Sequence, residues 1–249
     1  MLPADLRQAE SQALAALLEA LPSSERGRWS VDWRFEGLRL LPVALRFCQS
    51  LLEAGQSTRL VFPDAGACAL AKRDAPDLAA VITDFRGQKR RSADTADGTT
   101  GTEGETGTEG ETEQEGASDL LLAVAPALPD YEEFEQLCAV HRGPVVMLNG
   151  RLEDAAVGIG SVARERRRGF VAEWQAAYWL QPLAGSALCR AYPGAWELYR
   201  QDADGFRLAA RFEQKPDGEA QAEALAGEGG LGVGANLRSL ETFIEGLRS

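Results

Sequence analysis

Two continuous apolar runs separated by one amphipathic segment constrain the fold most strongly. Residues 119–126 (DLLLAVAP) and 144–150 (PVVMLNG) show no polar–apolar alternation, which is typical of strands buried on both faces of a parallel sheet. The residues between them have the apolar spacing of a helix, and Asp130 and Glu133 stand at capping-box spacing near its start. A strand, a helix and a strand of these lengths predict a right-handed parallel crossover.

The N-terminal part of the chain repeats this pattern. Leucines and alanines at helical spacing predict a helix over residues 6–21. Residues 29–35 (WSVDWRF) alternate aromatic or aliphatic with polar side chains, which predicts a strand with one covered face. A helix follows over residues 40–54, with Pro42 near its start and Gly55 just past its end, and residues 58–64 (TRLVFPD) predict a second strand.

The C-terminal half has a different order of predicted helices and strands. Residues 161–179 predict a long helix, short strands follow up to residue 212, and residues 236–247 predict a closing helix. The last two strands are joined through residues 202–205, as in a hairpin. We therefore expect one α/β domain over residues 1–249: three layers around a mixed sheet, with parallel strands in the first half and antiparallel strands in the C-terminal half.

The negative charge of the chain is concentrated in one segment. Nine of the 38 acidic residues lie between Asp94 and Asp119, whereas the rest of the chain is close to neutral despite a formal net charge of -12. Residues 93–118 contain GTEGET twice and no large apolar side chain, so we expect a disordered insertion. The remaining chain lacks the basic excess that nucleic acid binding requires, and we expect no nucleic acid partner.

Sequence motifs give little support for catalysis. G-x-x-x-x-G-K-[ST] and G-x-S-x-G are absent, and the lone histidine, His141, is expected at the surface end of a helix. The match of GIGSVA (158–163) to a dinucleotide fingerprint is weak, because it does not follow a strand directly. The four cysteines are far apart and predict reduced thiols. We therefore predict no catalytic residue, metal site or cofactor.

Two groups of residues are candidate binding sites. The first comprises polar residues at or after predicted strand ends, where ligands collect in open α/β sheets: Asp64, Arg73, Asp74 and Asn149. Asp and Asn are also ordinary turn residues, so turn chemistry is the alternative. The second is the arginine cluster Arg164, Arg166, Arg167 and Arg168, whose guanidinium groups could clamp a phosphate or an acidic partner. A solvated helical face is the alternative there.

Several distinctive strings carry a family resemblance. They include LVFPDAGACALAKRDAP (60–76), GPVVMLNGRLEDAAVGIG (143–160) and YPGAWELYR (192–200). Together with LLPVALR (40–46), LLLAVAP (120–126) and RRRGFVAEWQAAYWLQPL (166–183), they resemble the cyanobacterial branch of a domain family shared with chloroplasts. That family includes the plant low-photosystem-II-accumulation type of assembly protein and a domain fused to a chloroplast adenylate kinase.

The resemblance implies a non-catalytic photosynthetic accessory protein that helps to assemble or maintain a chlorophyll–protein complex, in particular photosystem II. Its partner would be a subunit of that complex, contacted through the arginine cluster and through the strand carrying Trp29 and Trp33. No stretch reaches the roughly 18 to 20 apolar residues of a membrane span, and no signal peptide is evident. We therefore expect a cytoplasmic protein peripherally associated with the thylakoid membrane.

Two other functions remain open at this stage. The strand-end residues could belong to a domain that binds or metabolises a small ligand or nucleotide, for which the fusion to a kinase is a parallel. The protein could also be a stoichiometric structural subunit of a photosynthetic complex.

Overall fold

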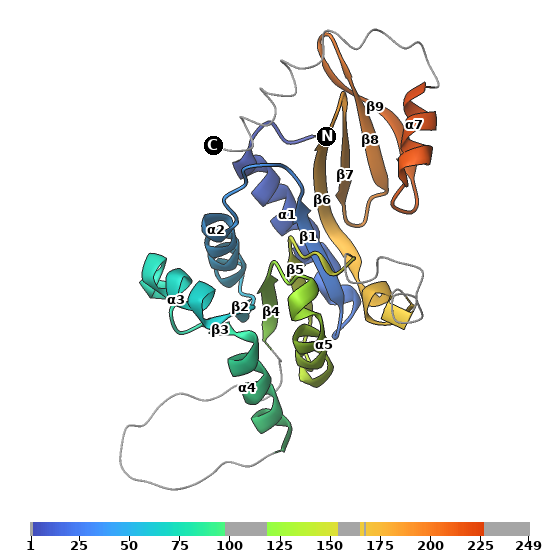
Figure 1. Ribbon diagram of the computed structural model, residues 1–249. Coiled ribbons are helices and arrows are strands. Elements are labelled where there is room, and N and C mark those ends of the chain that lie inside the picture. Colours follow the sequence, from blue (N-terminus) through green and yellow to red (C-terminus); the bar gives the residue numbers. More distant parts are fainter. Residues whose placement is uncertain (1, 98–118, 154–164, 167, 227–249) are drawn as a thin grey trace, which may run out of the picture.

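A nine-stranded mixed sheet organises the computed structural model, which describes residues 2–97, 119–153, 165–166 and 168–226 (Figure 1). The strand order is β3-β2-β4-β5-β1-β6-β7-β8-β9. Neighbouring strands from β3 to β6 run parallel, and those from β6 to β9 run antiparallel. The expected fold class, a mixed α/β sheet with parallel strands first and antiparallel strands last, is confirmed.

The strands are β1 (Arg28–Trp33), β2 (Thr58–Phe62), β3 (Ile82–Asp84), β4 (Leu120–Val124), β5 (Val145–Leu148), β6 (Gln175–Leu183), β7 (Ser186–Ala191), β8 (Trp196–Asp202) and β9 (Gly205–Phe212). The helices are α1 (Leu6–Ala20), α2 (Leu40–Glu53), α3 (Ala65–Asp74), α4 (Phe85–Asp97), α5 (Tyr131–Val140) and α7 (Gly218–Ala226). Short 3-10 turns include η2 (Pro76–Leu78) and η5 (Phe170–Glu173).

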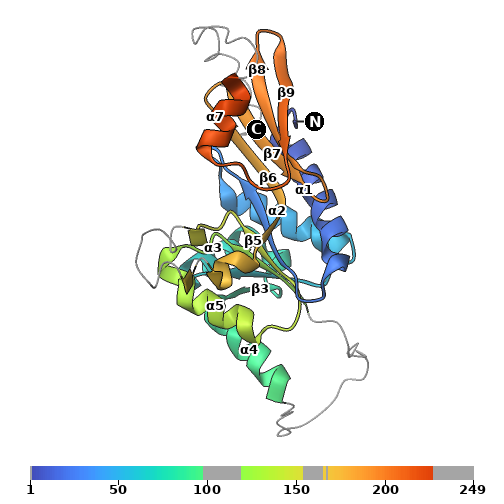
Figure 2. The same cartoon turned by 90° about the vertical axis from the view of Figure 1, so that its right-hand side faces the viewer.

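Helices cover both faces of the sheet. On β4, Leu120, Leu122 and Val124 pack into the core that contains α1, α2 and α3, whereas Leu121 and Ala123 pack into a second core with α4, α5 and η5. A third, smaller core joins the antiparallel strands to α7. In Figure 2, α1 lies on one side of the strands, and α5 and α7 lie on the other. The apolar runs of the sequence therefore predict strands with two covered faces correctly.

Strand β1 lies between two parallel neighbours, β5 and β6, and its side chains are buried on both faces of the sheet. Its odd-numbered residues Trp29, Val31 and Trp33 point into the first core. Its even-numbered residues Ser30 and Asp32 face the other side and are also buried. The expectation of one covered face on this strand is wrong, because the polar face lies under protein rather than in water.

The sequence places several boundaries incorrectly. The long helix expected over residues 161–179 is replaced at its C-terminal end by η5 and then by β6, which begins at Gln175. Strand β3 and helices α4 and α7 were not expected, and α4 runs to Asp97, so residues 93–97 are helical. The Asp130 carboxylate accepts the N–H of Ala127 (3.0 Å) and makes no cap to α5. Residues 98–118 and the helix expected at 236–247 lie outside the described residues.

None of the helices in the described parts of the chain combines the length and the apolar character that crossing a bilayer requires.

Asn149 fastens the end of β5 to the end of β1. Its Oδ1 accepts the N–H of Trp33 (2.7 Å), and its Nδ2 donates to the carbonyl of the same residue (2.8 Å). The backbone of Asn149 has a φ of 51°, in the left-handed region that asparagine tolerates better than most residues. The side chain therefore continues the ladder between the two strands after their backbone pairing has ended.

We predict that Asn149→Ala lowers the free energy of unfolding by about 2 to 4 kcal/mol, because it leaves two buried backbone groups of Trp33 unpaired and puts alanine at a positive φ. Asn149→Gly removes the same hydrogen bonds but accepts the backbone angle, so it should cost about 1 kcal/mol less. Denaturant unfolding of both variants measures the difference. A change below about 0.5 kcal/mol for Asn149→Ala would show that the clamp contributes little.

Candidate functional site

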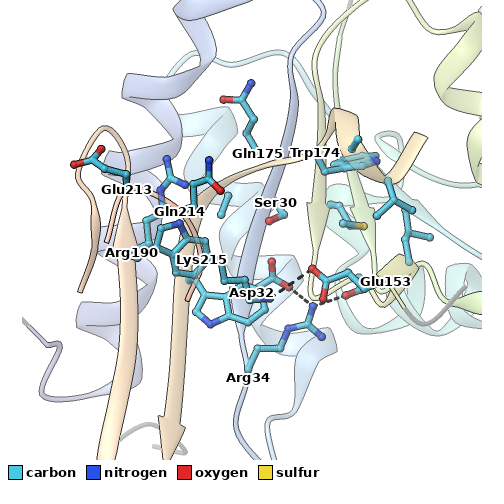
Figure 3. Close-up of a pocket in the computed structure, with 18 residues that line it drawn as sticks. Ser30, Asp32, Arg34, Glu153, Trp174, Gln175, Arg190, Glu213, Gln214 and Lys215 are labelled. Carbon is cyan, nitrogen blue, oxygen red and sulfur yellow. Dashed lines mark hydrogen bonds and ion pairs between the residues drawn. The ribbon is translucent and has the colours of Figure 1, made fainter. Parts of the chain in front are cut away.

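A cavity of about 710 Å³ lies on the second face of the sheet, over β1, β6 and β7. It is situated between the second core and the third. The second core contributes Met147 and Leu152 to its wall, and the third contributes Trp179 and Trp196. Figure 3 shows polar side chains from both sides pointing into it. Its other lining residues are Ser30, Asp32, Arg34, Gly150, Glu153, Val171, Ala172, Trp174, Gln175, Ala176, Arg190, Glu213, Gln214 and Lys215.

The floor of the cavity is one row of side chains across neighbouring strands. Asp32 on β1 pairs in register with Trp179 on β6, and Trp179 pairs with Arg190 on β7. The Trp196 ring on β8 lies 5.5 Å from the Arg190 guanidinium. Because side chains of paired residues point to the same face of a sheet, this row presents a carboxylate, an indole, a guanidinium and a second indole to the cavity.

Asp32 is the most deeply buried charged group of the site, with only 1% of its surface exposed. Burial raises the pKa of its carboxyl to about 6, although Arg34 and a hydrogen bond with Ser30 act in the opposite direction. The Arg34 Nη2 atom lies 2.8 Å from Asp32 Oδ1. That ion pair does not have the direction of a hydrogen bond, so Oδ1 has no hydrogen-bond donor.

Arg34 is fixed in place at the carboxyl end of β1. Its Nη2 donates to the carbonyl of Gly150 (2.5 Å), and its guanidinium lies 5.0 Å from the centre of the Trp179 ring. Position 150 has no room for a side chain, because a Cβ there would lie 2.1 Å from the sulfur of Met147. The glycine therefore leaves space for the Met147 side chain, which also lines the cavity.

Two further cations border the cavity. Arg190 is half-buried and has no ion-pair partner among the described residues, and burial lowers the pKa of its guanidinium. Lys215 lies at the rim, where its Nζ is 3.8 Å from the centre of the Trp179 ring and 3.5 Å from a Glu153 carboxylate oxygen. Arg190 thus differs from Arg34 and Lys215, each of which has a carboxylate beside it.

Unpaired polar atoms are concentrated here. Eight buried side-chain nitrogen or oxygen atoms in the described residues have no hydrogen-bond partner, and four of them belong to residues that line this cavity. They are Asp32 Oδ1, Arg34 Nε, Trp174 Nε1 and Arg190 Nε. Since an unpaired buried polar atom costs roughly 1 to 3 kcal/mol, such clustering is expected where a ligand supplies the missing partners.

Chemically, the site can bind polar groups and exchange a proton. A carboxyl group with a pKa of about 6 changes its charge close to neutral pH, as general acids and bases do. In the described residues no group of three or more His, Cys, Asp and Glu side chains could hold a metal ion.

The residues predicted as a strand-end ligand site do not line this cavity. Asp64 caps α3, where its carboxylate accepts the N–H of Ala67 (2.9 Å). Arg73 and Asp74 form an ion pair with each other at the exposed end of the same helix (2.8 Å). With Asn149 clamping Trp33, each member has a local structural role. A second cavity of about 560 Å³ does lie between α3 and α4, and its basic lining residues are Lys72, Arg90 and Arg91.

The residues predicted to dock onto a partner are also distributed differently. Trp29 and Trp33 are 2% and 1% exposed, packed against Tyr192 and Phe47, so the expectation that their rings lie on the surface is wrong. The Arg166 guanidinium lies 4.4 Å from the centre of the Tyr131 ring. Arg168 is exposed, whereas Arg164, Arg167 and the GIGSVA motif lie outside the described residues.

His141 is not at the surface either. It is buried at the end of α5, with Nε2 2.8 Å from the carbonyl oxygen of Asp119, and burial lowers its pKa.

Sequence reasoning did not single out Asp32, Arg34, Arg190 or Lys215. Asp32 carried one usable signal, because it stands between Val31 and Trp33 in a strand of strongly apolar residues. Arg190 and Lys215 carry none, since their position depends on the register of the antiparallel strands and on the chain after β9.

Comparison with protein families matches residues 3–223 to a domain of unknown function, DUF1995. The chain belongs to this family. The matched segment contains every residue that lines the Asp32 cavity, so the cavity lies wholly within the DUF1995 domain. A search of curated proteins finds no match.

We predict that Asp32→Asn stabilises the protein above neutral pH. The carboxyl has a pKa of 3.8 in its ordinary state and about 6 in the fold, so the native state holds this proton more tightly than the unfolded chain does. Stability is therefore lost as the pH rises from about 4 to 6, and the loss is complete above pH 7, where it is about 3 kcal/mol at most.

Asparagine cannot ionise, so the variant should have the higher free energy of unfolding at pH 8 and lose most of that advantage at pH 4. Urea unfolding at the two pH values measures the effect. A variant less stable than the wild type at pH 8 would contradict it.

Proposed function

We propose that this DUF1995 protein is a small-ligand binding protein and that the cavity over β1, β6 and β7 is its binding site. The observation that carries the proposal is that four residues lining one cavity each have a buried polar atom without a hydrogen-bond partner. Without a ligand, this arrangement destabilises the protein, because Asp32 and Arg190 are taken out of water with incomplete compensation. Binding sites tolerate such costs in exchange for affinity.

The size and lining of the cavity support the same proposal. A volume of about 710 Å³ is within the range of roughly 300 to 1,000 Å³ of small-molecule sites. The walls combine indole rings and the Met147 side chain with a few polar groups at fixed positions. Apolar walls with convergent polar groups are the usual composition of such sites, in which the polar groups orient the ligand.

We predict that Ala176→Phe abolishes ligand binding without unfolding the protein. Ala176 lines the cavity from β6 and is only partly buried, so a phenyl ring there should occupy the ligand space rather than the core. The control is Ala209→Phe, at an exposed position of β9 away from the cavity.

Thermal-shift screening of a library of metabolite-sized compounds is the measurement. A ligand at 100 times its Kd stabilises the native state by about 2.7 kcal/mol, and this gain should appear in the wild type and in Ala209→Phe only. A library without a binder, or binders that stabilise Ala176→Phe equally, would refute the proposal.

We further propose that the protein serves the assembly or maintenance of a chlorophyll–protein complex, photosystem II in particular, at the cytoplasmic face of the thylakoid membrane. What supports this role is the resemblance of the quoted strings to a family that includes a photosystem II assembly protein. Arg168 is exposed, and we propose the arginine cluster to which it belongs for contact with a subunit of that complex.

Deleting the gene in its photosynthetic host should lower the photosystem II content, and the wild-type gene should restore it. Complementation with Ala176→Phe and with Ala209→Phe then links the two proposals: only the second variant should restore the complex if the cavity serves assembly. Normal photosystem II content and antenna stoichiometry in the deletion strain would exclude the assembly role and leave the binding site to be judged by the ligand screen.

A further inference from the structure

We infer that the ligand of the Asp32 cavity is an organic anion, with a carboxylate or phosphate group bound by Arg190 and an apolar ring body held among the indoles. This inference rests on the proposed binding function and specifies the chemical class of the ligand.

The unpaired atoms of the cavity are mainly donors. Arg34 Nε, Trp174 Nε1 and Arg190 Nε can each donate one more hydrogen bond, whereas Asp32 Oδ1 is the one unpaired acceptor among the four. Donors therefore outnumber acceptors among these atoms, which favours a ligand rich in acceptors. When they are fully ionised, carboxylates and phosphates accept hydrogen bonds and donate none. Their hydrogen bonds to guanidinium groups are among the strongest in proteins.

The charges of the cavity select the same class. Arg34 has Asp32 beside it and Lys215 has Glu153, but Arg190 has no carboxylate partner in the described part of the chain. Burial lowers the pKa of Arg190, so its surroundings disfavour the positive charge that it carries without a ligand. A ligand anion would remove this cost directly, and a planar guanidinium edge suits a bidentate contact with two oxygens.

A cationic ligand does not fit the arrangement. The acceptor it would need is Asp32, which is 1% exposed and already beside the Arg34 guanidinium. Arg190 has no carboxylate beside it in the described part of the chain, and a ligand cation brought close to its guanidinium would be repelled. Glu213, the remaining carboxylate of the lining, is exposed at the rim.

The indoles define the rest of the ligand. The Trp196 ring lies 5.5 Å from the Arg190 guanidinium, and it and Trp179 flank Arg190 in the row on the floor. Trp174, at the opposite side of the cavity in Figure 3, stacks on Phe134 with ring centres 5.6 Å apart. Its unpaired Nε1 therefore lies on a ring whose position is fixed by packing. A ligand whose ring body lies between these walls would have its acidic group at Arg190 and a further acceptor near Trp174.

The test uses four probes with one naphthalene body and different head groups: 2-naphthoate, 2-naphthyl phosphate, neutral 2-naphthalenemethanol and cationic 2-naphthylmethylamine. Isothermal titration calorimetry of the full chain measures the four affinities. We expect at least one anion to bind at least tenfold more tightly than the neutral probe, and the cation to bind weakest. The preference between the two anions distinguishes a carboxylate ligand from a phosphate ligand.

Arg190→Gln should weaken binding of the preferred anion by about tenfold to a hundredfold, because a charge-assisted contact is lost, and should leave the neutral probe unchanged. The variant removes an uncompensated charge, so it should fold with at least wild-type stability; Arg190→Lys, which keeps the charge but not the planar edge, should be intermediate. The matched control is Arg200→Gln on β8, whose guanidinium is paired with Asp202 and does not line the cavity.

Equal binding of the neutral or cationic probe, or anion binding that Arg190→Gln does not weaken, would overturn the inference while the cavity remains a binding site. Failure of both anions to bind would also overturn it. In either case the library screen with Ala176→Phe decides the proposed binding function separately.

Discussion

The pairing of β1 with parallel strands on both sides is the constraint on which the rest of the structure depends. With β5 on one edge and β6 on the other, β1 lies inside the sheet, in the part that protein covers on both faces. The alternation of WSVDWRF therefore buries both sets of side chains. Trp29, Val31 and Trp33 enter one core, and Ser30 and Asp32 are buried on the opposite face. A carboxylate on that face is desolvated by the protein that covers it, which is the physical origin of its raised pKa.

The same strand order explains why a cavity forms there. Parallel neighbours require crossover connections, so the strands from β3 to β5 come with helices that cover the sheet, α4 and α5 on this face. Antiparallel neighbours are joined by hairpins and bring no such helix, so beyond β6 this face is covered by α7, which follows the last strand. The two coverings belong to different cores, and the cavity lies between them over β1, β6 and β7. Its position thus follows from the change from parallel to antiparallel pairing.

Much of the fold could be read from local pattern, and the site could not. The apolar runs 119–126 and 144–150 indicate buried strands because they are short, uninterrupted and bounded by turn residues, as strands covered on both faces are. Period-two alternation is ambiguous by comparison: it places Asp32 opposite Trp33 but does not distinguish a solvent-facing carboxylate from a cavity-facing one. Strand β3, with three residues, is too short for any periodicity. The position of Asp64 and Asn149 at strand ends predicts a ligand site. A helix cap, as at Asp64, and a clamp between strands, as at Asn149, use the same side chains as a ligand site does.

The row of residues on the floor also explains why two opposite charges can stay apart in one cavity. Asp32 and Arg190 lie on strands that are separated by β6, so their backbones are two inter-strand spacings of roughly 4.8 Å apart. Trp179 occupies the intervening position and is itself held by Arg34 on β1 and by Lys215 from the chain after β9. The indole therefore prevents the guanidinium from using Asp32 as its counter-ion. With a small side chain at position 179, Arg190 could form an ion pair with Asp32, and its guanidinium would no longer be available to a ligand.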